Sequence, residues 1–418
     1  MELKRVVVTG VGTINPLGNN VQEYFKNLND GVSGATLITR FDTSLFKTKF
    51  ACEIQGYEAE KFGFDRKEAR KLDRFCQYAI IAADEAIADS GMDLGKINKD
   101  RVGVVVGSGI GGIETLTQEI MGFSEGGNVP RFSPFLIPKM IPDMASGYIS
   151  IKYDFMGPNY ATVSACASSS HAMSNALDLI RLGRADIIVT GGAEAGITIP
   201  SVGGFNSAQA LSTNNENYKS ASRPFDKNRD GFVLGEGAGI LIFEEYGHAI
   251  ARGAKIYAEV AGYGMTADAH HITAPHPDGH GATQAMQLAL EDAGVKAEEV
   301  DYINVHGTST PLGDVAELKA IKSVFGESAY KVSISSTKSM TGHLLGAAGA
   351  IEILACIDAM QNGIIPPTIN FETEDPEIDY KMDLTLNKAR KREVNVAMSN
   401  TFGFGGHNST IILKKFIK

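Results

Sequence analysis

Cys166 is the residue whose sequence surroundings point most directly to chemistry. It stands between a short predicted strand and a helix that begins near Ala167, and its neighbours in "SACASSSHA" are small. Unpaired N–H groups and the dipole at a helix N-terminus lower the pKa of a thiol and favour the thiolate. Small neighbours leave room for a substrate, whereas a core cysteine normally has bulky apolar ones. We therefore predict that Cys166 is a nucleophile.

Two histidines and a charged pair could complete a site around this thiol. His306 ends the run "DYINVH" and His343 follows "SSTKSMTG", so both are predicted to lie in turns where a strand ends. A lone histidine is more often structural, but two in matching turns favour a shared role. Lys338 lies five residues before His343, and Glu352 follows at helical spacing. These two could form a buried ion pair beside the site, or each could lie at the surface.

The elements that must position these residues are strands alternating with helices. Short apolar runs rich in β-branched residues are separated by longer helical patterns, which predicts an α/β fold with buried sheets. The runs are "RVVVTG", "RVGVVVG", "ADIIVTGG", "GILIFEE", "IYAEVAG", "VDYINVHG", "VSISS" and "STIILKK".

Several of these segments occur twice. "VVVTGVG" resembles "AEVAGYG", and "EAIADSGMD" resembles "LALEDAGVK". We predict two related halves, residues 1–253 with the nucleophilic cysteine and residues 254–418 with the histidines. The turn at Cys166 and the turn at His343 would then face each other across a pseudo-twofold axis.

Composition restricts the function classes. The net charge of −10 disfavours nonspecific binding to nucleic acid, whose phosphates attract basic surfaces. No apolar run approaches the roughly 20 residues that span a bilayer, and the N-terminal residues show no signal-peptide core. The four cysteines contain no Cys-x-x-Cys pair, which favours free thiols in the cytoplasm. Cys76 and Cys356 lie in apolar helical runs and are predicted to be core residues.

The sequence disfavours two other kinds of site, a dinucleotide site and a metal site. "GSGIGG" (107–112) satisfies G-x-G-x-x-G, but the chain beyond it reads as loop, where a dinucleotide site needs a strand ending in an acid. A metal site from the histidines between 270 and 280 is disfavoured because Pro275 and Pro277 interrupt helical spacing. We expect no metal, and a loop at 270–280.

Long motifs along the chain resemble those of the β-ketoacyl-acyl-carrier-protein synthases. They are "VSACASSSHA", "VHGTSTPLGD", "SSTKSMTGHLLGAAGAIE" and "SNTFGFGGHNS", with "SRPFDKNRDGFVLGEGAG" and "GGFNSAQALST" in agreement. The resemblance covers nearly the whole chain and is closest to the chain-elongating synthase II type. It implies a thiolase-like fold, with duplicated α/β halves in a five-layered αβαβα arrangement, and a homodimer.

The resemblance also implies fatty acid chain elongation by decarboxylative Claisen condensation. Malonyl-acyl carrier protein would react with an acyl chain held on Cys166, giving 3-oxoacyl-acyl carrier protein and CO2. Acyl- and malonyl-loaded carrier proteins would be the partners. No cofactor is implied beyond the carrier's phosphopantetheine arm.

Roles follow from the matching motifs. Cys166 resembles the family nucleophile, and His306 and His343 resemble the histidines that stabilise the enolate. Lys338 resembles the family's invariant lysine, with Glu352 as its support. The backbone N–H groups of Cys166 and Phe404 would hold an oxyanion.

The resemblance extends to substrate contacts. "FGFGG" (402–406) would be a mobile loop at the entrance, with Phe402 against the substrate. Thr308 and Thr310 resemble hydroxyl contacts to the phosphopantetheine arm. Ile110 matches a position that lines the acyl pocket and would limit chain length.

A basic segment could bind the acidic carrier protein. Lys67, Arg70 and Lys71 lie in "DRKEARKLDR" at helical spacing, so they could share one helix face, in a segment that binds the carrier in related synthases. The simpler alternative is a solvated face whose charges pair with neighbouring acids.

Several relatives of this fold stay open as alternatives. A thiolase would carry a second cysteine as base and an initiating synthase an asparagine beside one histidine, whereas this chain has His343. Type I synthases and polyketide-pathway ketosynthases are harder to separate. A noncatalytic chain-length partner would lack the nucleophile, so Cys166 disfavours it.

Overall fold

The computed structural model describes residues 3–417 and has the alternating strands and helices that the sequence predicts. Within these residues one sheet has ten strands in the order β10-β9-β13-β14-β8-β1-β7-β6-β4-β5. It consists of two sets of five, joined where Val7 and Val8 of β1 pair with Glu259 and Ala258 of β8. No helix of the described chain is long and apolar enough to cross a membrane.

The first set of five strands includes the one that leads toward Cys166. It comprises β1 (Val6–Ile14), β4 (Val102–Gly107), β5 (Asn159–Tyr160), β6 (Ile187–Glu194) and β7 (Gly237–Glu245). The second set comprises β8 (Ala258–Ala267), β9 (Tyr302–Asn304), β10 (Ser333–Ser335), β13 (Val396–Gly403) and β14 (His407–Lys415). Two small two-stranded sheets contain β2 (Thr36–Leu37) with β3 (Phe50–Ala51) and β11 (Ile364–Ile365) with β12 (Arg390–Lys391).

The two sets of five strands have the same topology. In the first, β1 pairs antiparallel with β7 and β7 with β6, while β6–β4 and β4–β5 are parallel. In the second, β8–β14 and β14–β13 are antiparallel, while β13–β9 and β9–β10 are parallel. Each strand of one half therefore has a counterpart in the other, which supports the predicted duplication.

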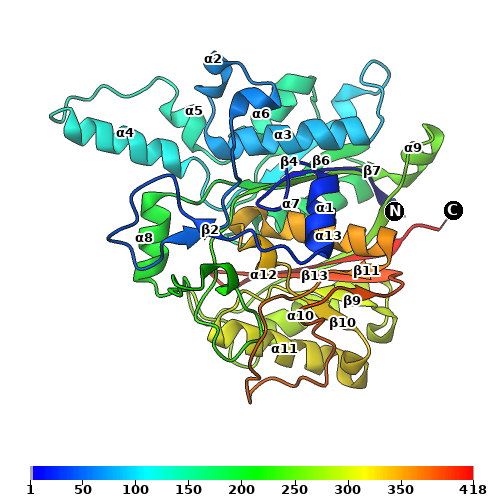
Figure 1. Cartoon of the computed structure of the whole chain (residues 1–418). Helices are drawn as coiled ribbons and strands as arrows, with labels where there is room; N and C mark the ends of the chain where they lie inside the picture. The colour runs from blue at the N-terminus through cyan, green and yellow to red at the C-terminus, as the bar shows by residue number, and fades with distance from the viewer. Residues whose placement is uncertain (1–2, 418) are drawn as a thin grey trace.

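The helices form three layers around the two sets of strands. In Figure 1, α3 and α6 cover the first set, α7 and α13 lie between the sets, and α10 and α11 cover the second. These layer helices are α3 (Arg74–Asp89), α6 (Met144–Tyr153), α7 (Ser168–Arg181), α10 (His280–Ala293), α11 (Pro311–Phe325) and α13 (Ala348–Asn362). The others are α1 (Val21–Asn29), α2 (Arg66–Ala69), α4 (Ile113–Glu125), α5 (Leu136–Met140), α8 (Ile199–Ser207), α9 (Tyr246–Ala251) and α12 (Lys338–Thr341).

Close packing of a helix on a strand explains the repeated "TGVG" and "AGYG" segments. A Cβ at Gly12 of β1 would lie 2.1 Å from the Ala82 oxygen of α3. A Cβ at Gly264 of β8 would lie 2.0 Å from the Ala285 oxygen of α10. Any larger residue would push the helix away, so both halves need glycine at this contact.

Candidate active site

Cys166 lies in a strained turn two residues before α7. Its predecessor Ala165 has φ +49°, a left-handed conformation that costs free energy for a residue with a Cβ. Ser309 and Leu345, in the two histidine-bearing segments, also have positive φ values of 66° and 48°. Such strain persists only where the surrounding structure imposes it, and three of these strained residues belong to the segments that meet at this thiol.

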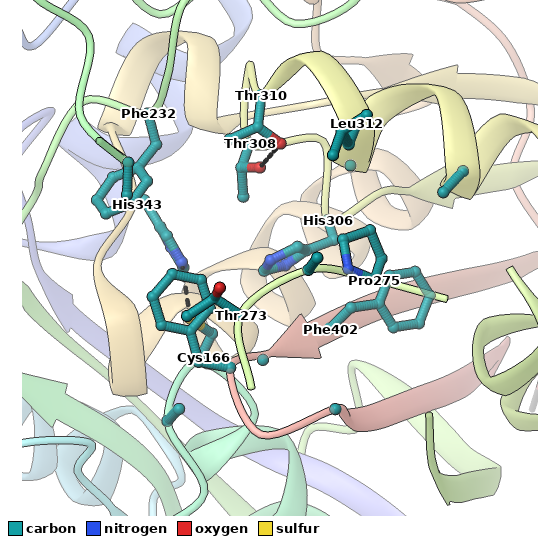
Figure 2. A pocket seen from close by; sticks show the side chains of 18 of the residues that line it. Cys166, Phe232, Thr273, Pro275, His306, Thr308, Thr310, Leu312, His343 and Phe402 are labelled. Atoms are coloured by element: carbon teal, nitrogen blue, oxygen red, sulfur yellow. Dashed lines mark hydrogen bonds between the residues drawn. The ribbon is translucent and has the colours of Figure 1, made fainter. Parts of the chain in front are cut away.

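The structure brings both predicted histidines to the thiol. Nε2 of His343 lies 3.0 Å from Sγ of Cys166. Ligand atoms of Cys166, His306 and His343 all lie within 4.8 Å of one another, and Figure 2 shows the three side chains converging on one cavity. Phe232 packs edge-on against His343, and Phe402 lies beside His306, with ring centroids 5.3 and 5.9 Å apart.

The positions of the histidines in the chain differ in part from the prediction. His306 comes two residues after β9, as a strand-end turn requires. His343, however, lies well beyond β10, because the one-turn helix α12 intervenes before α13. The predicted strand-end turn is therefore wrong for His343, although the turn does face Cys166.

Lys338 and Glu352 form the buried ion pair that the spacing suggested. Each side chain is only 2% exposed, and Nζ of Lys338 contacts Oε1 of Glu352. Burial raises the pKa of Glu352 to about 7, although the Lys338 charge opposes this. Burial, and then the same ammonium, lower the pKa of His306 and of His343 well below the usual value. Both imidazoles are therefore neutral near pH 7.

Burial has the opposite effect on Cys166 from the one predicted. It raises the pKa of the thiol to about 12, although the Lys338 charge and hydrogen bonds from the backbone N–H groups of Phe404 and Cys166 lower it. The helix-start prediction of a low thiol pKa is wrong for this closed site, because desolvation of the thiolate outweighs these favourable contacts. Cys166 is therefore a neutral thiol near pH 7.

Phe404 lies in a tight hairpin between β13 and β14. Phe402 and Gly403 still belong to β13, so the predicted loop 402–406 is shorter than expected. Gly405 and Gly406 have φ values of 86° and 73°, which the hairpin turn requires. This turn brings the Phe404 N–H to Sγ of Cys166, where an oxyanion hole is needed.

The remaining predicted substrate contacts line one cavity of about 450 Å³. Ile110, Thr308, Thr310 and Phe402 all lie on its wall together with Cys166. The hydroxyl oxygens of Thr308 and Thr310 are 3.1 Å apart, a contact drawn in Figure 2. A thioester with a long polar arm could thus contact hydroxyl groups before its carbonyl reaches the thiol.

The basic segment is arranged differently from the prediction. Lys67, Arg70 and Lys71 are exposed, but α2 is a single turn and a bend separates it from α3, so one shared helix face is wrong. None of the three forms an ion pair within residues 3–417, whereas Arg66 and Arg74 both do. The predicted pairing with neighbouring acids is absent for these three cations.

Two buried carboxylates beside the site were not predicted from the sequence. Glu317 accepts hydrogen bonds from the N–H groups of His306 and Gly307, at 2.9 and 2.8 Å. Glu194 binds the turn that carries Ile110. The available signal was an acid at the end of an apolar strand, "IIVTGGAE", and an acid within the apolar face of α11.

The structure also bears on the dinucleotide and metal sites that the sequence disfavoured. "GSGIGG" follows β4 and precedes α4, but Gly109 and Ile110 line the cavity beside Cys166. Residues 270–279 contain no helix or strand, as expected, but the predicted loop 270–280 is one residue too long because His280 begins α10. Among the described residues, Cys166, His306 and His343 are the group whose sulfur and nitrogen atoms could hold a metal such as zinc. The Lys338 charge beside both imidazoles disfavours a cation there.

Known protein families match this chain over most of its length. The family "Beta-ketoacyl synthase, N-terminal domain" matches residues 3–249, and "Beta-ketoacyl synthase, C-terminal domain" matches residues 257–372. The chain belongs to the β-ketoacyl synthase family. It is 51% identical to a "3-oxoacyl-[acyl-carrier-protein] synthase 2" from Synechocystis sp., over 100% of this chain and 99% of the relative. A Staphylococcus aureus protein of the same name is 49% identical over 99% of both chains.

Solved structures show the same fold. A β-ketoacyl synthase from Burkholderia phymatum superposes with a TM-score of 0.91 at 36% identity, covering 99% of this chain and 100% of its own. The ishigamide ketosynthase/chain length factor has a TM-score of 0.92, also at 36% identity, with the same coverage. A type II polyketide ketosynthase in complex with its acyl-carrier protein has a TM-score of 0.90 at 34% identity, covering 99% and 100%. The predicted thiolase-like α/β fold is confirmed.

Proposed function

We propose that this β-ketoacyl synthase elongates fatty acyl chains by decarboxylative Claisen condensation. An acyl group passes from acyl carrier protein to Cys166 and then condenses with malonyl-acyl carrier protein, giving 3-oxoacyl-acyl carrier protein and CO2. The observation that carries the proposal is the convergence of the thiol, placed 3.0 Å from His343, with His306 in one buried cluster. Full-length relatives near 50% identity, which are named 3-oxoacyl-acyl-carrier-protein synthase 2, support this substrate class.

The first half-reaction transfers the acyl chain. Sγ of Cys166 attacks the thioester carbonyl, and the N–H groups of Cys166 and Phe404 stabilise the tetrahedral oxyanion. In its Nε2–H tautomer His343 donates to the sulfur and stabilises the developing thiolate. The thiol proton passes to the departing pantetheine sulfur. The buried thiol thus ionises only when a substrate is present to accept its electrons.

The second half-reaction uses the histidines. Malonyl-acyl carrier protein loses CO2, and the electron pair delocalises onto the thioester oxygen as an enolate. The Nε2–H groups of His306 and His343 stabilise this charge, as neutral imidazoles can. The carbanion then attacks the acyl carbonyl, and the Cys166 thiolate leaves and takes up one proton from solvent, which restores the resting thiol. Burial and then the charge of Lys338, which Glu352 holds in place, lower the pKa of both imidazoles and keep them neutral, and the same charge favours negative charge at the centre.

The alternatives of the same fold fit less well. The type II polyketide ketosynthase and the ishigamide ketosynthase/chain length factor are 34% and 36% identical to this chain, below the roughly 50% of the synthase 2 relatives, which favours the fatty acid reaction. A noncatalytic chain-length partner would have no need of a thiol held against two neutral imidazoles.

The acyl carrier protein is the proposed partner, with Lys67, Arg70 and Lys71 as its docking surface. These exposed cations have no internal ion-pair partner within the described chain, so they are available to an acidic surface. No step of this chemistry needs a cofactor other than the carrier's phosphopantetheine arm, with Thr308 and Thr310 placed to contact it. The cytoplasm, where free thiols persist, is the proposed compartment.

We also propose two structural properties. The chain consists of two related halves, residues 1–253 and 254–418, on the basis of their matched strand topology. It forms a homodimer through the edge strand β5 and through the projecting α4–α5 region (Figure 1). Exposed apolar side chains of that region include Ile120, Phe132 and Ile137, which are 52%, 41% and 57% exposed. Light scattering should give a mass of two chains for the wild type. The double variant Phe132→Asp with Ile137→Asp should have the mass of a single chain.

The decisive test of function uses carrier-bound substrates. The protein is incubated with acyl-carrier proteins of increasing chain length plus malonyl-carrier protein, and the products are identified by mass. A product two carbons longer with a 3-oxo group is expected. Acyl transfer without condensation, or products extended repeatedly without reduction, would contradict single-round fatty acid elongation.

A further inference from the structure

Glu194, at the end of β6, is a fully buried carboxylate that the reaction does not use. Its Oε2 accepts hydrogen bonds from the N–H groups of Gly109 and Gly346, at 2.7 and 2.9 Å. Its Oε1 accepts from the N–H of Ile110 at 3.2 Å and from Oγ of Ser108 at 3.1 Å. Within the described residues it forms no ion pair, so four hydrogen-bond donors take the place of a cation.

The carboxylate joins two turns that are distant in sequence. A Cβ at Gly109 would lie 2.8 Å from Oε2, and a Cβ at Gly346 would lie 2.3 Å from the Gly109 N. Only glycine at both positions lets the two backbones meet at one side chain. The turns carry Ile110 and Leu345, and both of these residues line the cavity that contains Cys166.

This arrangement opposes the chemistry rather than helping it. Burial raises the pKa of Glu194 to about 7, and the charge of Glu194 contributes to raising the pKa of Cys166. Burying a carboxylate without a counter-ion is costly, even when hydrogen bonds compensate in part. A charge that hinders thiolate formation next to the nucleophile has to serve another purpose, and its four contacts all hold the cavity wall.

We propose that Glu194 is a positioning residue that limits how far the acyl chain extends from Cys166, by holding the Ile110 turn against the Leu345 turn. The proposal rests on the proposed use of this cavity for the acyl chain. With the clamp in place the two apolar side chains form a fixed wall. When the clamp is loosened, the wall retreats and longer chains fit.

The test is Glu194→Gln, which keeps the shape but replaces one acceptor oxygen by an NH2 donor. If the NH2 takes the place of Oε2, the contacts from Gly109 and Gly346 are lost because donors face donors. If it takes the place of Oε1, the contact from the Ile110 N–H is lost, whereas the Ser108 hydroxyl can accept from the new NH2. Cys166 acylation is measured by intact-protein mass spectrometry with acyl-carrier proteins of increasing length. The ratio of long-chain to short-chain rates should rise about tenfold, the scale of a buried donor losing its acceptor. Glu194→Asp, which keeps the charge but withdraws the oxygens, should act in the same direction.

Glu85→Gln is the matched control. Glu85 on α3 also accepts two backbone N–H groups, from Thr13 and Val21, and burial also raises its pKa, but it does not line the cavity. Its chain-length profile should match that of the wild type. Equal slowing for every chain length in the Glu194 variants would overturn the proposal, because a general structural defect acts on all substrates alike.

Amide hydrogen exchange separates this inference from the proposed function. In Glu194→Gln, segments containing Gly109, Ile110 and Gly346 should lose protection, and in Glu85→Gln they should not. Unchanged protection there would overturn the clamp, whatever the activity. A wild-type protein that accepts no acyl group would instead overturn the proposed function and the chain-length role together, leaving only the clamp as a structural result.

Discussion

The turn after β4 and the turn after β9 occupy equivalent places in the two halves but present different side chains. Each is tied through backbone N–H groups to a buried glutamate, Glu194 in the first half and Glu317 in the second. Burial raises the pKa of both carboxylates to about 7. The first turn offers the apolar Ile110, whereas the second offers His306. One scaffold therefore positions the proposed acyl-chain wall in one half and the proposed enolate donor in the other.

The segments that precede α7 and α13 differ in the same way. Cys166 reaches the site through a short strained turn, whereas the second half adds α12, which carries Lys338, before His343. In the proposed reaction the first half holds the acyl group, and the second supplies neutral donors and a fixed positive charge. This comparison predicts that damage to each half affects a different half-reaction.

The largest expected effect is that of Cys166→Ala. Acyl transfer and condensation should be abolished, because no other nucleophile reaches the thioester, while the fold is kept. Malonyl-carrier protein should still lose CO2, since the histidines remain in place. Intact-protein mass spectrometry and labelled CO2 release measure the two. A stable acyl adduct on the variant would mean that another residue is the nucleophile.

Removing single histidines should separate the half-reactions. His306→Ala and His343→Ala should each slow decarboxylation by about 10²- to 10³-fold, the usual loss for one such donor. Only His343→Ala should also slow acylation markedly, because His343 alone of the two contacts Sγ directly. Both rates are measured on the same preparations. Unchanged CO2 release from both variants would remove the assigned role from both histidines.

Much of the fold of the two halves was predictable from local sequence. The apolar runs mark their strands, and the repeated glycine segments mark the close contacts of β1 with α3 and of β8 with α10. Strand β13 was missed because its central residues, Ser399, Asn400 and Thr401, are polar although buried, so period-two hydrophobicity is absent. Its glycine-rich end resembled a loop.

The site could be predicted in its members but not in its electrostatics. Motif positions identify Cys166 and the histidines, yet the thiol pKa depends on how completely α7 and the hairpin exclude water, which is a tertiary property. The contacts of Glu194 likewise join two turns that are far apart in sequence, at Gly109 and Gly346. Local patterns contain no record of these contacts.

The pH dependence of Cys166 alkylation tests which of these effects dominates. Because burial raises the pKa of the thiol to about 12, its thiolate fraction should grow about tenfold per pH unit through the neutral and mildly alkaline range. A small neutral alkylating agent should therefore react ever faster from pH 6 to about pH 9, with no plateau. Cys166→Ala supplies the background from the three other cysteines, all buried. A plateau near pH 7 would mean that the helix-start effect prevails over burial.

The smallest expected effect concerns carrier docking, which involves only the surface of the first half. Lys67→Glu with Arg70→Glu should raise the apparent KM for acyl-carrier protein by a few-fold, since exposed charge pairs contribute only modestly. The effect should be strongest at low salt and weaken near 0.15 M, where the Debye length is about 8 Å. A free acyl-pantetheine substrate should show little change, because it does not need the surface.

The matched control reverses Lys388 and Lys391, two exposed lysines of the second half, and changes the net charge equally. Both double variants lose the same long-range attraction to the acidic carrier, because their net charges are equal. If docking depends on local contacts, the control should therefore keep the wild-type KM for the carrier. An equal rise of the KM for acyl-carrier protein in both double variants would mean that only the net charge of the enzyme matters. Equal losses with carrier-bound and free substrates would indicate damage to the site instead. Only a loss restricted to the first pair and to carrier-bound substrate assigns docking to the unpaired cations beside α2.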